Sequence, residues 1–165
     1  MRTVVLGNSG TGKSTLAARL ARTGALPHLD LDTLAWLPIA PPQRRPIADS
    51  ARDIAAFMDA SDRWVIEGCY ADLLEVALPH TTRLVFLNPG VAACIANARA
   101  RPWEPHKYAS KEAQDANLDL LIGWIQDYER RRDEFSLTAH RALFDRFTGD
   151  KHELTSREAI AAFAA

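Results

Sequence analysis

The sequence predicts an α/β protein in which a five-stranded parallel sheet lies between two layers of helices. Short β-branched and apolar runs alternate with longer stretches of helical periodicity along the chain. Strands joined by helices pair in parallel, and such a sheet is covered on both faces. The length of 165 residues is that of one domain, which we expect to span residues 1–165.

A phosphate-binding motif follows the first predicted strand. Residues 7–14 read Gly-Asn-Ser-Gly-Thr-Gly-Lys-Ser and match the P-loop pattern G-x-x-x-x-G-K-[ST] at every fixed position. The strand at residues 3–6 and the helix at residues 15–22 supply the flanking structure that a P-loop requires. The motif therefore makes the predicted architecture a three-layer P-loop NTPase fold. The dinucleotide pattern G-x-G-x-x-G cannot be placed on these glycines.

The loop is expected to bind a nucleotide through its backbone and through two side chains with separate roles. Its glycines let successive N–H groups turn toward phosphate oxygens. Lys13 would act in catalysis by placing its charge against the β- and γ-phosphates. Ser14 would offer its hydroxyl to a magnesium ion that bridges them. The predicted nucleotide-binding residues are Gly7, Asn8, Ser9, Gly10, Thr11, Gly12, Lys13, Ser14 and Thr15.

The other elements follow from apolar periodicity and from the positions of glycine and proline. Predicted strands lie at residues 27–32, 64–67, 83–88 and 151–154. Predicted helices lie at residues 49–60, 71–78, 91–101, 111–135 and 137–147, and a last helix ends near residue 164. Prolines keep residues 38–46 in a loop.

Acidic residues follow the second and third predicted strands, where ligands of an open parallel sheet bind. Asp30 and Asp32 alternate, so a regular strand would point them to opposite faces. We favour Asp32 as the group that orients or deprotonates a phosphoryl acceptor, and as a magnesium ligand, directly or through water. Glu67 is placed to hold a metal-bound water or a substrate group. Helix capping is the alternative role for each of these acids, and an ion pair is a further one for Glu67.

The predicted acceptor site lies between Asp32 and the segment 38–60. Trp36 and Tyr70 follow the two acidic strand ends and are candidate substrate contacts. The complete set of predicted substrate-binding residues is Asp30, Asp32, Trp36, Glu67 and Tyr70.

Residues 99–111 are predicted to form a basic lid. Arg99 and Arg101 would stabilise the charge of the transferring phosphoryl group when this segment closes over the nucleotide. A solvated basic face at a helix end is the alternative. The run of arginines at 130–132 is interpreted as a solvated helix face without a role.

Composition excludes several functions. The net charge of −1 gives no bulk attraction to nucleic acid or to an anionic membrane. Cys69 and Cys94 have no metal-ligand spacing and fit a reduced, cytoplasmic setting. We find no apolar run that could cross a bilayer and no signal-peptide pattern at the start of the sequence.

On these residues the chain resembles the adenylate-kinase-like branch of small P-loop kinases. The P-loop, residues 31–36 and residues 64–70 look most like bacterial "DNA topology modulation" kinase-like proteins. The Asp30-x-Asp32 spacing is similar to that of shikimate and gluconate kinases, where the pair serves magnesium and the acceptor hydroxyl. Shikimate kinases carry a Gly-Gly segment where this chain has Glu67-Gly68-Cys69. The resemblance implies ATP and Mg²⁺ as cofactors.

The sequence thus favours an ATP-dependent phosphotransferase acting on a small-molecule or nucleotide acceptor. The alternative is a nucleotide-dependent regulatory or binding protein that transfers nothing. A GTPase is disfavoured because Asn88 is followed by Pro89 and Gly90 rather than by an N-K-x-D motif. No recognition helix for DNA is evident. The acceptor and the oligomeric state stay open.

Overall fold

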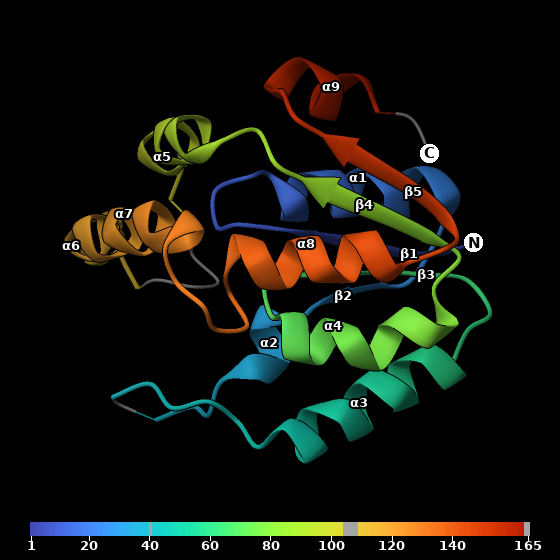
Figure 1. Ribbon diagram of the computed structural model, residues 1–165. Coiled ribbons are helices and arrows are strands. Elements are labelled where there is room, and N and C mark those ends of the chain that lie inside the picture. The colour runs from blue at the N-terminus through green and yellow to red at the C-terminus, as the bar shows by residue number, and fades with distance from the viewer. Residues whose placement is uncertain (40, 104–108, 164–165) are drawn as a thin grey trace.

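A five-stranded parallel sheet forms the centre of the computed structural model, which describes residues 1–39, 41–103 and 109–163 (Figure 1). The strand order is β2–β3–β1–β4–β5, so the P-loop strand β1 occupies the middle. The bounds are β1 Arg2–Gly7, β2 His28–Asp30, β3 Trp64–Gly68, β4 Arg83–Leu87 and β5 Asp150–Leu154. The predicted α/β architecture is confirmed, including the short polar strand β5.

Helices cover both faces of the sheet because successive side chains of each strand point to opposite sides. Val4 and Leu6 face the layer formed by α3 (Ile47–Asp59), α4 (Ala71–Ala77) and α8 (Leu137–Arg146). Val5 faces the opposite layer, formed by α1 (Lys13–Gly24) and α9 (Arg157–Ala162). Burial on both faces explains why β1, β3 and β4 are continuous apolar runs.

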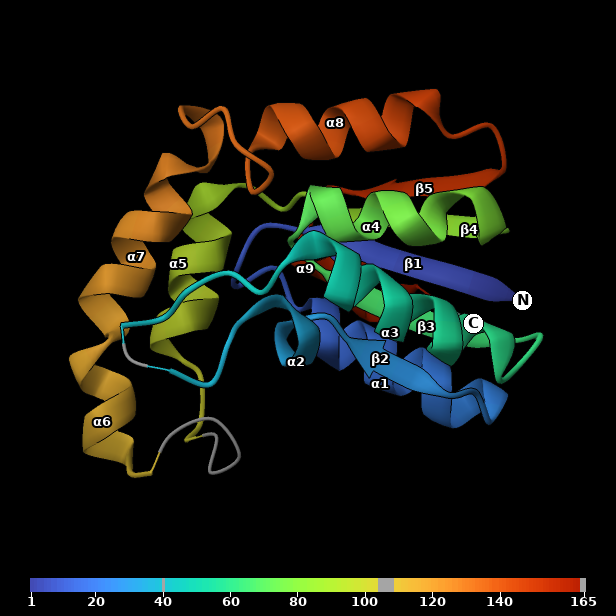
Figure 2. The same ribbon diagram turned by 90° about the horizontal axis from the view of Figure 1, so that it is seen from below.

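Three further helices stand beyond the carboxyl ends of the strands (Figure 2). They are α5 (Val91–Arg99), α6 (Lys111–Ala116) and α7 (Leu118–Gln126). The apolar faces of α5 and α7 meet around Cys94, Ala98 and Ile125, in a small core separate from the two that cover the sheet. None of the described helices has the length and hydropathy needed to span a membrane.

The predicted long helix at 111–135 is wrong. The chain turns at Asn117, whose side-chain amide donates to the carbonyl of Ala113 at 2.8 Å, and this turn lets α7 pack against α5. After α7 a 3₁₀ turn, η2 (Asp127–Glu129), ends the helical stretch. The arginines at 130–132 consequently lie in a turn and not on a helix face.

Two shorter elements also differ from the prediction. The strand expected at 27–32 ends at Asp30, and Asp32 begins a four-residue helix, α2 (Asp32–Ala35). After α4 the chain continues in a 3₁₀ turn, η1 (Leu78–His80), through Pro79. The predicted irregular segment after α2 is held as a narrow loop by the bridge between Trp36 and Arg44.

Candidate active site

The P-loop joins β1 to α1 in the conformation that its glycines permit. Gly10 and Gly12 have φ angles of 78° and 91°, in the left-handed region that favours glycine. At Gly10 there is also no room for a side chain, because a Cβ would stand 2.5 Å from the carbonyl oxygen of Cys94. The loop ends at the first turn of α1, whose N–H groups and dipole favour an anion. This backbone fits a nucleotide phosphate.

Lys13 lies over the loop from the first position of α1. Its ammonium donates to the carbonyl oxygen of Asn8 at 2.9 Å, and the Thr11 hydroxyl donates to the same oxygen at 2.9 Å. Ser14 follows as an exposed residue of the same turn. Lys13 and Ser14, the two side chains of the loop with predicted roles, are therefore adjacent at the N-terminal end of α1.

The helices beyond the strand ends are tied directly to this loop. The Asn8 side-chain amide donates to the carbonyl of Ile125 in α7 at 3.1 Å. The Asn97 side-chain amide, from α5, donates to the carbonyl of Gly10 at 2.8 Å. Asn8 is among the predicted nucleotide-binding residues, whereas Asn97 is an uncharged residue of α5 that no sequence motif marks.

Glu67 is the buried acid of the site. It pairs with Val5 of β1 and with Asp30 of β2 in the sheet register, which sets it beside the P-loop. The residue is only 1% exposed, and its Oε1 atom has no hydrogen-bond partner among the described residues. Burial raises the pKa of Glu67 to about 7, while Lys13 and a hydrogen bond with Ser14 act in the opposite direction.

These residues fit a magnesium ion of the kind that binds with phosphate. Mg²⁺ is usually held by one or two carboxylates, water and phosphate oxygens rather than by a complete protein cage. The described residues contain no cluster of three or more His, Cys, Asp or Glu side chains that could hold a metal without a phosphate. The unpartnered oxygen of Glu67 and the Ser14 hydroxyl are the polar groups that such an ion would complete.

Asp30 and Asp32 have different surroundings. Oδ1 of Asp30 accepts a hydrogen bond from the Asp32 backbone N–H at 2.9 Å, so Asp30 stabilises the start of α2. Asp32 is exposed, and its Oδ1 accepts a hydrogen bond from the Tyr70 hydroxyl at 2.7 Å. The two acids therefore differ in their contacts, and they do so because α2 begins at Asp32, where a regular strand was expected.

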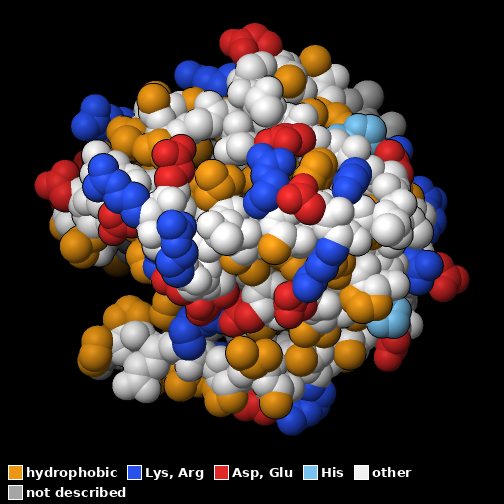
Figure 3. All heavy atoms as spheres, in the orientation of Figure 1, with side chains coloured by type: hydrophobic (Ala, Val, Ile, Leu, Met, Phe, Trp, Pro, Cys, Tyr) orange, Lys and Arg blue, Asp and Glu red, His pale blue; other side chains and the backbone are white. Residues whose placement is uncertain are grey.

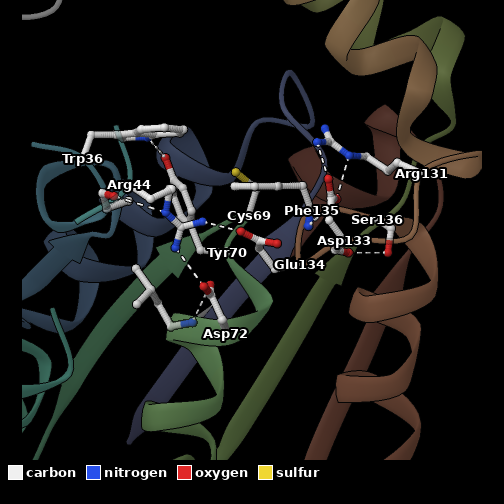
Figure 4. Close-up of polar contacts among 12 residues, drawn as sticks. Trp36, Arg44, Cys69, Tyr70, Asp72, Arg131, Asp133, Glu134, Phe135 and Ser136 are labelled. Atoms are coloured by element: carbon white, nitrogen blue, oxygen red, sulfur yellow. Dashed lines mark hydrogen bonds and ion pairs between the residues drawn. The ribbon is translucent and has the colours of Figure 1, made fainter. Parts of the chain in front are cut away.

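Tyr70 supports Asp32 and is itself supported by Trp36. The Trp36 indole N–H donates to the Tyr70 hydroxyl at 2.8 Å (Figure 4). Tyr70 is 3% exposed, whereas Trp36 keeps part of its surface accessible. Both residues are predicted substrate contacts. The Tyr70 hydroxyl links them to Asp32, because it accepts a hydrogen bond from Trp36 and donates one to Asp32.

Arg44 is a member of this cluster that the sequence analysis missed. Its guanidinium donates to Glu134 at 2.7 Å, to Asp72 at 2.8 Å and to the carbonyl of Ala35 at 3.2 Å (Figure 4). It also lies 5.0 Å from the ring centre of Tyr70. An arginine in a proline-rich loop gives no signal of its own, because both carboxylate partners are remote in sequence.

A buried histidine supports the chain behind Tyr70. His140 of α8 donates from Nε2 to the carbonyl of Cys69 at 3.0 Å, and its Nδ1 accepts from the Tyr128 hydroxyl at 2.8 Å. Burial lowers the pKa of His140 to about 4, so the ring is neutral at pH 7. This assignment of the ring proton follows because a carbonyl can only accept.

The predicted lid lies only partly within the described residues. Arg99 ends α5, and with Arg101 it borders a small hollow whose other lining residues include Gln114 and Leu118. Lys111 begins α6 and forms an ion pair with Asp115. Residues 104–108 of the predicted lid are outside the described residues. The two arginines thus lie at the junction of α5 and α6.

Two solved structures share this fold over most of their length. A gluconokinase from Sinorhizobium meliloti 1021 matches with a TM-score of 0.50 and 17% identity, over 97% of this chain and 89% of its own. A sugar kinase from Janibacter sp. HTCC2649 matches with a TM-score of 0.51 and 15% identity, over 93% and 83%. No protein-family model matches the chain, and no curated protein sequence is significantly similar to it.

The chain therefore has the fold of small P-loop kinases. At these identities the likeness extends to the fold alone. The shared fold supports the general resemblance to small P-loop kinases. It does not support the finer resemblance to topology modulation proteins.

Proposed function

We propose that this protein is an ATP-dependent phosphotransferase that moves the γ-phosphoryl group to a hydroxyl of a small-molecule or nucleotide acceptor. The observation that carries the proposal is the position of Asp32. It is an exposed carboxylate held by Tyr70 and close enough to Glu67 to raise that residue's pKa. A protein that only binds nucleotide has no need of an oriented carboxylate on the acceptor side.

The P-loop residues 7–15 would hold MgATP. Lys13, which now donates to the loop carbonyl of Asn8, would exchange that partner for the β- and γ-phosphates. Ser14 and Glu67 would hold the magnesium ion, with Asp32 as a further ligand, directly or through water. When bound, magnesium neutralises charge on the phosphate oxygens.

Asp32 would take the proton of the acceptor hydroxyl as that oxygen bonds to the γ-phosphorus. The bond between the γ-phosphorus and the bridging oxygen breaks, and ADP leaves with the electron pair. Tyr70 keeps the carboxylate oriented during this exchange because its hydroxyl donates to Oδ1. Asp30 supports the same segment by holding the start of α2.

Arg99 and Arg101 are the proposed catalytic residues of the lid. Closure of the segment 99–111 would bring them to the transferring phosphoryl group and exclude water from it. The partners are then the nucleotide and the acceptor, with no nucleic acid or membrane. A cytoplasmic location, where ATP is available, fits this activity.

The test is coupled detection of ADP release with MgATP, against nucleoside monophosphates, nucleosides and hydroxylated metabolites. We expect one acceptor class to raise turnover well above the rate with water. A flat panel, together with tight MgATP binding measured separately, would reject the phosphotransferase and favour the nucleotide-dependent regulator.

A further inference from the structure

Each arginine of the acceptor side has a carboxylate partner, and the two nearest the loop bridge, Arg44 and Arg45, are mostly shielded from solvent. Within residues 36–59 the sequence contains three basic side chains, Arg44, Arg45 and Arg52. Arg45 pairs with Asp53 at 2.6 Å and Arg52 with Asp49 at 3.2 Å. An acceptor that carries a phosphate group would be expected to meet an available arginine here.

Arg44 is linked to Asp32 through Tyr70, and it has more partners than Arg45 or Arg52. The terminal nitrogens of Arg44 donate to the carboxylates of Asp72 and Glu134, and its Nε donates to the carbonyl of Ala35. Its side chain is 23% exposed. To bind a phosphate, Arg44 would have to give up one of these acids, which would then stay partly buried without its partner.

A second arginine, Arg131, is held in the same way, and both guanidinium groups lie near the ring of Phe135. Arg131 forms two parallel hydrogen bonds with Asp133, each 2.7 Å (Figure 4). Its guanidinium also stacks on Trp124, 3.7 Å from the ring centre. Both guanidinium groups thus have their edges on carboxylates and their faces on aromatic rings. They hold loops together and are not presented as anion receptors.

Two acidic residues lie at the end of β2 on this side. Asp32 is exposed, and Asp30 is half-buried and accepts a hydrogen bond from the Asp32 backbone N–H at 2.9 Å. Like charges disfavour an anionic acceptor at this position. The accessible part of Trp36 beside Asp32 offers instead an aromatic surface for a sugar ring or a base.

We infer, on the basis of the proposed function, that the acceptor is an uncharged hydroxyl compound, a sugar or a nucleoside, and not its phosphorylated counterpart. Asp32 would recognise the hydroxyl, and Trp36 the apolar face of the ring. A nucleoside monophosphate is then the wrong substrate for this site.

Matched pairs of acceptors test the inference: a nucleoside with its 5′-monophosphate, and a hexose with its phosphate ester. We would measure turnover with MgATP, and binding by calorimetry in the presence of MgADP. The uncharged member should be preferred by about tenfold or more in one pair, which also distinguishes nucleoside from sugar. Preference for a phosphorylated member overturns the inference. If no compound is turned over, the phosphotransferase proposal fails, and the binding ratio still decides the charge of the ligand.

A charge variant sharpens the test. Glu134→Gln releases Arg44 from one carboxylate, so binding of the phosphorylated member should improve about tenfold while that of the uncharged member changes less than twofold. Asp72→Asn is a second variant with the same expectation. Glu75→Gln is the matched control, because Glu75 pairs with Arg146 at 2.6 Å in an exposed ion pair. An unchanged ratio in both acceptor-side variants would contradict the inference.

Discussion

The hydroxyl of Tyr70 donates a 2.7 Å hydrogen bond to Oδ1 of Asp32 and links a core aromatic residue to an exposed acid. The phenol cannot rotate away, because its ring packs against Phe135 at a centroid distance of 5.4 Å and its oxygen also accepts from Trp36. The acid that we place at the acceptor is therefore oriented by the protein core, although it stands in solvent.

Tyr70→Phe should lower kcat about tenfold and leave the KM for MgATP unchanged, because one orienting hydrogen bond is lost and the ring remains. Asp32→Asn should lower kcat by about 10²–10⁴-fold, the usual contribution of a general base. Steady-state kinetics on both variants check this. Equal losses in kcat and in ATP affinity for Asp32→Asn would assign Asp32 to metal binding or to structure.

Lys13→Ala should lower phosphoryl transfer by about 10²–10³-fold or more, because the charge against the β- and γ-phosphates is lost. The fold should persist, since the ammonium contacts a loop carbonyl and not the apolar core. Circular dichroism and thermal unfolding serve as the control. Undiminished turnover in a folded Lys13→Ala protein would refute the phosphotransferase.

Glu67→Gln should change the pH dependence of stability. The pKa of Glu67 is about 7 in the folded protein against 4.5 in the unfolded chain, so the folded state binds the proton more tightly. Its contribution is fully present below pH 4.5 and is lost as pH rises through 7, by roughly 3 kcal/mol. Glu67→Gln removes this decline.

Urea unfolding at pH 5 and pH 8, without nucleotide or magnesium, measures the effect of Glu67→Gln. Glu75→Gln, an exposed change of the same kind, should keep the wild-type slope between the two pH values. A wild-type slope in Glu67→Gln would mean that the carboxyl titrates normally.

His140→Gln should reveal a pH effect of the opposite sign. The pKa of His140 is about 4 when folded and 6.5 when unfolded, so the unfolded chain binds the extra proton. Its contribution is present above pH 6.5 and is lost as pH falls toward 4. The variant should lose that acid-side decline and be less stable by about 1–3 kcal/mol at pH 7, because Tyr128 and the Cys69 carbonyl lose their partner.

Unfolding of His140→Gln from pH 4 to pH 7 measures this slope, and His80→Gln, at an exposed turn, is the control. An acid-side decline that survives in His140→Gln would assign it to other groups.

The sheet and its flanking helices could be predicted because each depends on local patterns. The motif at residues 7–14 and the apolar runs of β1, β3 and β4 are short-range signals of strand, loop and helix. The long helix at 111–135 could not be divided correctly. Asn117 interrupts the helix between α6 and α7, and α7 packs against α5, a tertiary contact that no local pattern encodes.

The sequence predicts the parts of the candidate site that local patterns mark, which are the P-loop and the acids at strand ends. It does not predict contacts between residues that are far apart in sequence. Arg44 and Glu134 meet across 90 positions. The run of arginines at 130–132 suggests a solvated face, so the sequence predicts no role for it. Arg131 instead stacks on Trp124, a contact that depends on a turn and not on composition.

The surface view shows basic and acidic side chains side by side over much of the face of Figure 1 (Figure 3).

The amides of Asn8 and Asn97 give the protein a built-in thermodynamic linkage. Each joins the phosphate loop to a helix that follows β4, one through Ile125 of α7 and one directly from α5. A nucleotide that rearranges the loop must alter the free energy of those helices. By reciprocity, any event that displaces the helices alters nucleotide affinity by the same factor. The two amide hydrogen bonds are the contacts through which such a coupling would act.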